Sequence, residues 1–125
     1  MTKVIATENA PQAIGPYSQG LVVGNMVMTS GQIPLNPKTG EMADTIEEQT
    51  KQSLTNVKAI LEEGGSSMEK VVHTTVFLQD LNDFTAMNEV YATFFTGILP
   101  TRSCVQVAKL PKGAKVEIEA TGTID

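Results

Sequence analysis

The residues from Val71 to Leu78 read VVHTTVFL, and no other segment limits the possible folds so strongly. Nearly all of them are β-branched or aromatic, and the run is too short for a core helix. It therefore predicts a central strand with two largely apolar faces. Apolar residues at helical spacing precede this run, and others follow it. A central strand between two amphipathic helices predicts an α+β domain.

The helix predicted before this strand extends from about Thr45 to Glu63. Asp44 and Thr45 offer an N-cap, because acidic residues follow three positions later. The pair Gly64-Gly65 supplies the left-handed conformation that commonly ends a helix. A single stripe is predicted from the three- and four-residue spacing of Ile46, Thr50, Leu54, Val57, Ile60 and Leu61.

The helix predicted after the strand begins at Asn82 or Asp83, either of which can serve as its N-cap. Gly97 and Pro100 end this helical segment. Both helices are amphipathic, so each has one side that must pack on the sheet. The apolar side of the second helix comprises Phe84, Met87, Tyr91, Phe94 and Phe95.

Four more strands are predicted from β-branched runs and from alternation of apolar and polar residues. The first two are separated by Gly24-Asn25, which tolerates the positive φ angles of a primed two-residue turn, so they form a β-hairpin. The last alternates apolar residues with Glu117, Glu119 and two threonines, which predicts one core face and one polar face. The four extend from Ser18 to Val23, Met26 to Ser30, Ser103 to Ala108 and Lys115 to Ile124.

These elements form one domain over residues 1–125, since the chain has no internal repeat and no linker. Two helices cannot cover both faces of a five- or six-stranded sheet. We therefore expect a single mixed sheet with both helices packed on one face. The other face is left for a second subunit, which predicts a homo-oligomer.

Charge and composition disfavour several classes of function. The chain has a net charge of −5 and no basic cluster, so nucleic acid is a poor partner. One cysteine, one histidine and the lack of metal-site or phosphate-loop spacings predict no metal and no cofactor. The single cysteine, without a signal segment or an apolar span, predicts a cytoplasmic protein with no membrane contact.

Arg102 is the first candidate for a functional side chain. It follows Pro100-Thr101 and opens a strand of small and β-branched residues, where a guanidinium has no packing purpose. Its planar fork can bind a carboxylate bidentately, although a solvated surface arginine fits the same position. On the polar face of the last strand, Glu117 can act as a general base for water. Glu119 lies on the same face, and spacing does not choose between the two carboxylates.

Two other reactive side chains are expected to have structural roles. Cys104 lies within a strand, where cysteine is commonly a small buried hydrophobe, and the only available base is His73 on another strand. Alternation places His73 on one face with Val71, Thr75 and Phe77. Composition and spacing alone therefore lead to an α+β domain with one candidate anion site.

Three segments carry a resemblance to a known family: AIGPYSQG at residues 13–20, TSGQIP at 29–34, and PTRSCV at 100–105 with VEIE at 116–119. In this order they resemble the reactive-intermediate deaminase (RidA) family. The likeness runs from about Ile5 to the C-terminus and includes SLTNVK at 53–58 and TVFLQDL at 75–81. Two positions depart from the family pattern, with Thr101 where alanine is usual and Gln106 where an acidic residue is frequent.

The resemblance implies a chorismate-mutase-like α+β fold assembled as a homotrimer, with clefts between neighbouring subunits. It implies that Arg102 binds the carboxylate of the substrate and that Glu117 positions the attacking water. An arginine near Glu117 would oppose the rise of its pKa on burial. The other residues that line the cleft by this resemblance are Tyr17, Ser30, Gly31, Asn88 and Cys104.

The activity implied by the resemblance is hydrolysis of reactive 2-imino acids, such as 2-iminobutanoate and 2-iminopropanoate, to 2-keto acids and ammonia without a cofactor. Two other functions stay open. One is a regulatory trimer that binds small carboxylates without turnover. The other is a ribonuclease or translation inhibitor, against which the acidic charge and the lack of a histidine pair argue.

Overall fold

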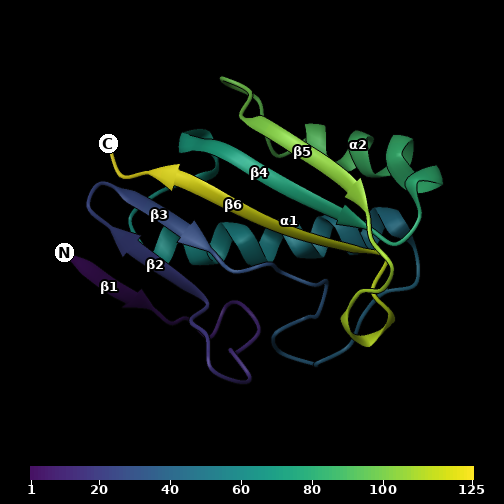
Figure 1. Cartoon of the computed structure of the whole chain (residues 1–125), viewed down its shortest axis with the longest axis horizontal. Helices are drawn as coiled ribbons and strands as arrows, with labels where there is room; N and C mark the ends of the chain where they lie inside the picture. Colours follow the sequence, from purple (N-terminus) through teal and green to yellow (C-terminus); the bar gives the residue numbers. More distant parts are fainter.

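The computed structural model describes all 125 residues and contains one sheet with two α-helices on one of its faces (Figure 1). The strands are β1 (Thr2–Ile5), β2 (Gly20–Val23), β3 (Met26–Thr29), β4 (Val71–Leu78), β5 (Thr101–Gln106) and β6 (Val116–Thr123), and the helices are α1 (Ile46–Glu63) and α2 (Phe84–Ala92). Their order in the sheet is β1-β2-β3-β6-β4-β5. Only β4 and β5 run parallel, so the sheet is mixed and the expected fold class is confirmed.

β6 lies inside the sheet between β3 and β4, and its side chains alternate between the two faces. Val116, Ile118 and Ala120 are buried beneath the helices. Glu117 and Glu119 lie on the opposite face, where they are half-buried. The predicted division of this strand is confirmed, and the face without helices is called the open face below.

α1 ends where the sequence predicts and covers the sheet with its apolar stripe. Thr45 caps the helix, since its Oγ1 accepts a 3.2 Å hydrogen bond from the backbone N–H of Glu48. Gly65, with φ of 94°, turns the chain away after the last turn. The stripe on α1 buries Leu54, Val57, Ile60 and Leu61 completely.

No helix of the structure is both long and apolar enough to cross a membrane.

The β-hairpin of β2 and β3 is confirmed, with Gly24 at φ of 62° in its turn. β4 occupies the predicted eight residues. The sequence did not reveal β1, which pairs with β2 at the edge of the sheet. Three of its four residues are exposed, so it lacks the buried alternation that would distinguish it from a disordered terminus.

The helix α2 ends before the residues Gly97 and Pro100 that were predicted to end it. The helix ends at Ala92, although the apolar pattern continues to Phe95. Phe95 stays buried because its ring packs on that of Tyr91, with centroids 4.5 Å apart, even though the backbone has left the helix. The apolar side-chain pattern therefore extends beyond the last helical hydrogen bond of α2.

Two strand details also differ from the prediction. β5 begins at Thr101 rather than Ser103, because its pairing with β4 starts opposite His73 and ends opposite Leu78. A β-bulge separates Val71 from His73 in the pairing of β4 with β6. The extra residue puts Val71 beneath the helices and His73 on the open face, so the prediction that they share a face is wrong.

Leu54→Ala should lower the free energy of unfolding by about 2 to 5 kcal/mol, because it removes a fully buried side chain and leaves a cavity against the sheet. Urea unfolding at one fixed protein concentration measures this loss. Thr55→Ala, on the exposed side of the same helix, is the control and should change the stability by less than about 0.5 kcal/mol. Equal losses in the two variants would contradict this assignment of the core.

Candidate functional site

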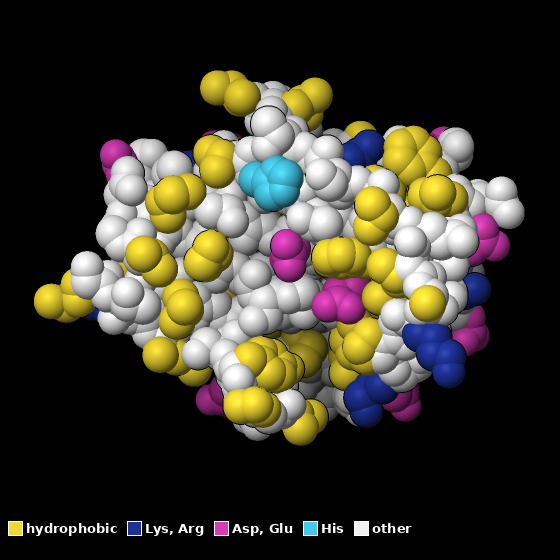
Figure 2. Space-filling model, viewed as in Figure 1, with side chains coloured by type: hydrophobic (Ala, Val, Ile, Leu, Met, Phe, Trp, Pro, Cys, Tyr) yellow, Lys and Arg dark blue, Asp and Glu magenta, His cyan; other side chains and the backbone are white.

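The open face, which Figure 2 shows from the front, carries the candidate base Glu117. Its carboxylate lies against the chain that follows β3. A Cβ atom at Gly31 would collide with this carboxylate and stand 2.9 Å from its Cδ, so a side chain at this position would displace the carboxylate. Gln32 and Ile118 exchange backbone hydrogen bonds of 2.8 and 3.1 Å, which holds the two segments together.

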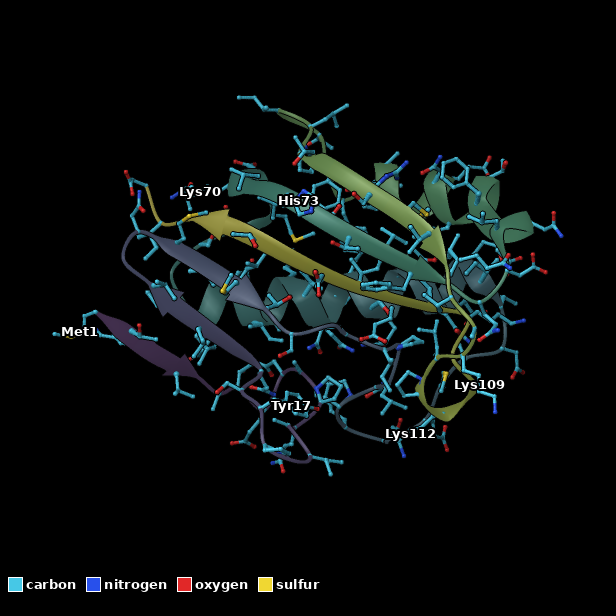
Figure 3. The ribbon with its side chains drawn as sticks, in the orientation of Figure 1. Met1, Tyr17, Lys70, His73, Lys109 and Lys112 are labelled. Carbon is cyan, nitrogen blue, oxygen red and sulfur yellow. The ribbon has the colours of Figure 1, made fainter.

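A cavity of about 550 Å³ opens beside Glu117. Tyr17, Ser30 and Gly31 also line it, so four of the predicted site residues come together here. Tyr17 lies in the loop below the sheet in the view of Figure 3, with about half of its surface exposed. We call this group of four residues the carboxylate half-site. Sequence reasoning missed other lining residues, which include Gln12, Ile14, Ile33 and Lys112.

The buried amide of Gln19 fixes the loop that carries Tyr17. Its Oε1 accepts a hydrogen bond of 2.7 Å from the backbone N–H of Thr7, and its Nε2 donates to the carbonyls of Ala10 and Pro11 at 3.2 and 2.7 Å. Such buried polar contacts leave no donor unpaired and hold one loop conformation. The sequence offered no signal for this role beyond the presence of Gln19 in the AIGPYSQG motif.

Ser30 joins the same loop to the end of β3. Its Oγ donates a 2.6 Å hydrogen bond to the carbonyl of Ser18, and the backbone N–H of Ser30 donates to the carbonyl of Gln19 at 2.8 Å. The hydroxyl proton is therefore engaged within the protein, and its oxygen lone pairs remain available to a ligand. Ser30 positions the cavity wall and is not activated by a neighbouring base.

The pKa of Glu117 is raised above its ordinary value, first by burial and then by repulsion from the carboxylate of Glu119. Within one chain, Arg102 does not contribute to the pKa of Glu117, so the expectation that it opposes this rise in a cleft between subunits stays a prediction. The raised pKa makes Glu117 a better proton acceptor than an exposed glutamate.

Arg102 lies in a second cluster, on the helix side of β5. Its Nη1 donates a 2.6 Å hydrogen bond to Oδ1 of Asn88 on α2. The guanidinium carbon stands 5.4 Å from the ring centroid of Phe84 and 4.8 Å from that of Tyr91, within the range of cation–π attraction. The other N–H groups of Arg102 form no hydrogen bond in the chain, which leaves donors for a carboxylate.

Cys104 lies two residues after Arg102 on the same side of β5 and packs against the core. Burial raises the pKa of its thiol, and the nearby Arg102 opposes part of this rise. A neutral thiol is a weak nucleophile, so the expected positional role of Cys104 agrees with its surroundings. Arg102, Asn88 and Cys104 form the arginine half-site.

The two half-sites lie on opposite faces of the sheet. Arg102 pairs with Thr74 on β4, and the hydroxyl of Thr74 contacts the Tyr91 hydroxyl of α2 at 2.7 Å, which fixes this row on the helix side. Glu117 pairs with Phe77, an odd number of residues from Thr74, on the open face. A single chain therefore does not bring the two principal candidates together.

The two departures from the family pattern both tie β5 to its surroundings. Oγ1 of Thr101 donates to the carbonyl of Val72 at 3.0 Å and lies 2.8 Å from Nδ1 of His73. Since the single hydroxyl proton goes to Val72, Nδ1 of His73 is the donor in the second contact. Oε1 of Gln106 accepts a 2.9 Å hydrogen bond from the backbone N–H of Leu81.

A family model described as endoribonuclease L-PSP, whose members are also called YjgF or RidA proteins, matches residues 7–124. The chain belongs to the RidA family. The match extends over nearly the whole sequence and both half-sites, and it confirms the family that the three sequence motifs resemble.

Relatives within the RidA family share both the sequence and the fold. The 2-iminobutanoate/2-iminopropanoate deaminase of Escherichia coli K12 is 58% identical over 123 residues, which cover 96% of each chain. The crystal structure of the Escherichia coli YjgF gene product is 56% identical with a TM-score of 0.96, covering 98% of this chain and 99% of that one. Escherichia coli TdcF with bound serine is 52% identical with a TM-score of 0.94, covering 97% and 98%.

Glu119→Gln should lower the pKa of Glu117, because a neutral amide removes the repulsion between two neighbouring carboxylates. Burial remains, so the pKa of Glu117 should stay above the ordinary value for glutamate. A carbon-13 NMR titration of the Glu117 carboxyl measures both effects. The exposed Glu89→Gln is the control, and an unchanged titration of Glu117 in the Glu119 variant would show that these two carboxylates do not interact.

Proposed function

We propose that this protein is a hydrolytic deaminase that converts short 2-imino acids, such as 2-iminobutanoate and 2-iminopropanoate, to 2-keto acids and ammonia without a cofactor. The relative that is 58% identical is named for this activity. The observation that carries the proposal is the pair of complementary half-sites. One presents a guanidinium with free donors, and the other holds a half-buried carboxylate beside a cavity. We also infer a cytoplasmic location from the single free cysteine.

The working site is formed between subunits of a homotrimer. Because the half-sites lie on opposite faces, they meet only when the β5 and α2 side of one copy packs against the open face of the next. Such a head-to-tail contact generates a ring when the rotation between copies closes, and family resemblance implies a ring of three subunits. Large apolar side chains that are exposed in the single chain become buried in this contact. Val4 on the open face is 70% exposed, and Ile98 beside β5 is 89% exposed.

Arg102 binds and orients the substrate. Two N–H groups of the guanidinium hold the carboxylate of the imino acid, which fixes the position of the adjacent imine carbon. Nη1 of the guanidinium donates to Asn88 of the same chain, so the remaining N–H donors are left for the substrate at the neighbouring subunit. A lysine would lose the bidentate contact with the carboxylate, so it is not an equivalent replacement.

Glu117 activates the water. Its ionised carboxylate accepts a proton from a water molecule as the water oxygen bonds to the imine carbon, and the imine nitrogen takes up a proton to give a carbinolamine. The carbon–nitrogen bond then breaks as ammonia departs. The hydroxyl becomes the keto oxygen by releasing its proton to solvent, which balances the proton that the imine nitrogen took up from solvent. The raised pKa lets the same Glu117 return the proton toward the leaving nitrogen.

Two other functions use the same surfaces. A regulatory trimer would bind 2-keto acids through Arg102 and leave the spontaneous rate of imine hydrolysis unchanged. The description of the family model as endoribonuclease L-PSP favours a ribonuclease. The net charge of −5, the single histidine and the two carboxylates on the open face weaken that alternative, since they disfavour phosphate binding.

The activity is tested by following the lifetime of an imine. A threonine dehydratase generates 2-iminobutanoate, semicarbazide traps what remains, and the trapped product is compared with and without protein. The wild type should shorten the imine lifetime. Arg102→Ala should raise KM and lower turnover, whereas Glu117→Gln should mainly lower kcat. A correctly assembled wild type that leaves the lifetime unchanged would favour the binding regulator.

The shared site is tested by mixing the two inactive variants. In a ring, the intact Arg102 of a Glu117→Gln chain meets the intact Glu117 of an Arg102→Ala chain. Random 1:1 assembly makes about three quarters of the trimers mixed, each with one complete site in three, so about a quarter of the wild-type activity should return. Mixed trimers confirmed by mass spectrometry that stay inactive would contradict a site shared between subunits.

A further inference from the structure

Lys112 has an unusual backbone conformation for its residue type. Its φ of 57° and ψ of 23° lie in the left-handed region, and every other positive φ in the chain belongs to glycine. The residue lies in η3, a short 3₁₀-helical turn (Pro111–Gly113) between β5 and β6. Left-handed backbone at a residue with a long side chain costs stability, and such residues cluster where function requires them.

Lys112 lines the same cavity as Glu117. Among the lining residues it is the one cation and Glu117 is the one anion. Tyr17 and Lys112 come from separate loops and lie on two sides of this region in Figure 3. The strained turn therefore places a positive charge at the wall of the carboxylate half-site.

Lys112 does not neutralise Glu117. Burial and Glu119 account for the raised pKa of Glu117, and a nearby ammonium would have lowered it instead. The amine is also exposed to solvent and forms no hydrogen bond within the chain. Its charge is therefore free to meet a ligand.

Apolar side chains form one part of the cavity wall, beside polar residues that include Gln12, Gln32 and Ser30. Ile14, Ile33, Leu35 and Pro111 contribute to it. A cavity of about 550 Å³ exceeds the volume of a three- or four-carbon imino acid several times over, given about 30 Å³ for one water molecule. A substrate with its imine carbon at Glu117 therefore has room for a longer side chain that extends toward Lys112.

We infer that Lys112 forms a second anion subsite, which favours 2-imino acids with a carboxylate at the end of the side chain, such as the imine of glutamate. This inference rests on the proposed deaminase activity and deepens it. Arg102 of the neighbouring subunit holds the carboxylate next to the imine carbon. Lys112 attracts the distal carboxylate, and the apolar part of the wall accommodates the methylene groups between them.

Lys112→Asn tests the subsite, because asparagine tolerates left-handed backbone and removes the charge. The matched control is Lys109→Asn, which removes a charge from the same connection but not from the cavity wall (Figure 3). Amino-acid oxidases generate the imines of glutamate and of alanine, and semicarbazide trapping gives kcat/KM for each imine. Sedimentation and thermal unfolding establish that the variants assemble and fold like the wild type.

For Lys112→Asn, kcat/KM for the glutamate imine should fall by about three- to tenfold, the range for one partly exposed charged contact, and by less than about twofold for the alanine imine. The loss should shrink at high salt. Lys109→Asn should change neither value by more than about twofold. Equal losses for both imines, or no loss for the glutamate imine, would overturn the inference about Lys112. Activity on the alanine imine would still support the deaminase proposal in that case. A wild type inactive on both imines would instead overturn the deaminase itself.

Discussion

The alternation of side chains along β6 is the constraint on which the rest of the molecule depends. Val116, Ile118 and Ala120 anchor the sheet to α1, while Glu117 and Glu119 occupy the opposite face of the same strand. A shift of one residue in the register of β6 would bury the carboxylates beneath the helix and expose the core. The folding of the domain and the placement of its candidate base are therefore fixed together.

Much of the fold could be predicted from the sequence because local signals and tertiary packing agree. The Gly24-Asn25 turn, the Thr45 cap and the β-branched run of β4 each specify one structure. The predictions were wrong where tertiary contacts replaced local ones. The aromatic packing of Phe95 continued the helical pattern beyond α2, and one extra residue at the β4 bulge put Val71 on the opposite face from His73.

Family motifs in the sequence predicted the residues of the candidate site. They did not predict that these residues lie on two opposite faces of the sheet. Spacing alone left Glu117 and Glu119 equivalent, and only the contact with Gly31 and the cavity distinguishes Glu117. Lys112 was not identified from the sequence, because no sequence pattern indicates that a non-glycine residue will adopt left-handed backbone. Contacts between segments distant in the chain decide these roles, and single-sequence patterns do not contain them.

The setting of Arg102 has a thermodynamic consequence. Phe84, Asn88 and Tyr91 are spaced four and three residues apart along α2, so one side of this helix surrounds the guanidinium. A free arginine side chain loses about 1.5 to 2 kcal/mol of conformational entropy when it is immobilised. Here that loss occurs when the chain folds, before any ligand arrives. This entropy loss therefore lowers the stability of the folded domain and does not lower the affinity for a ligand.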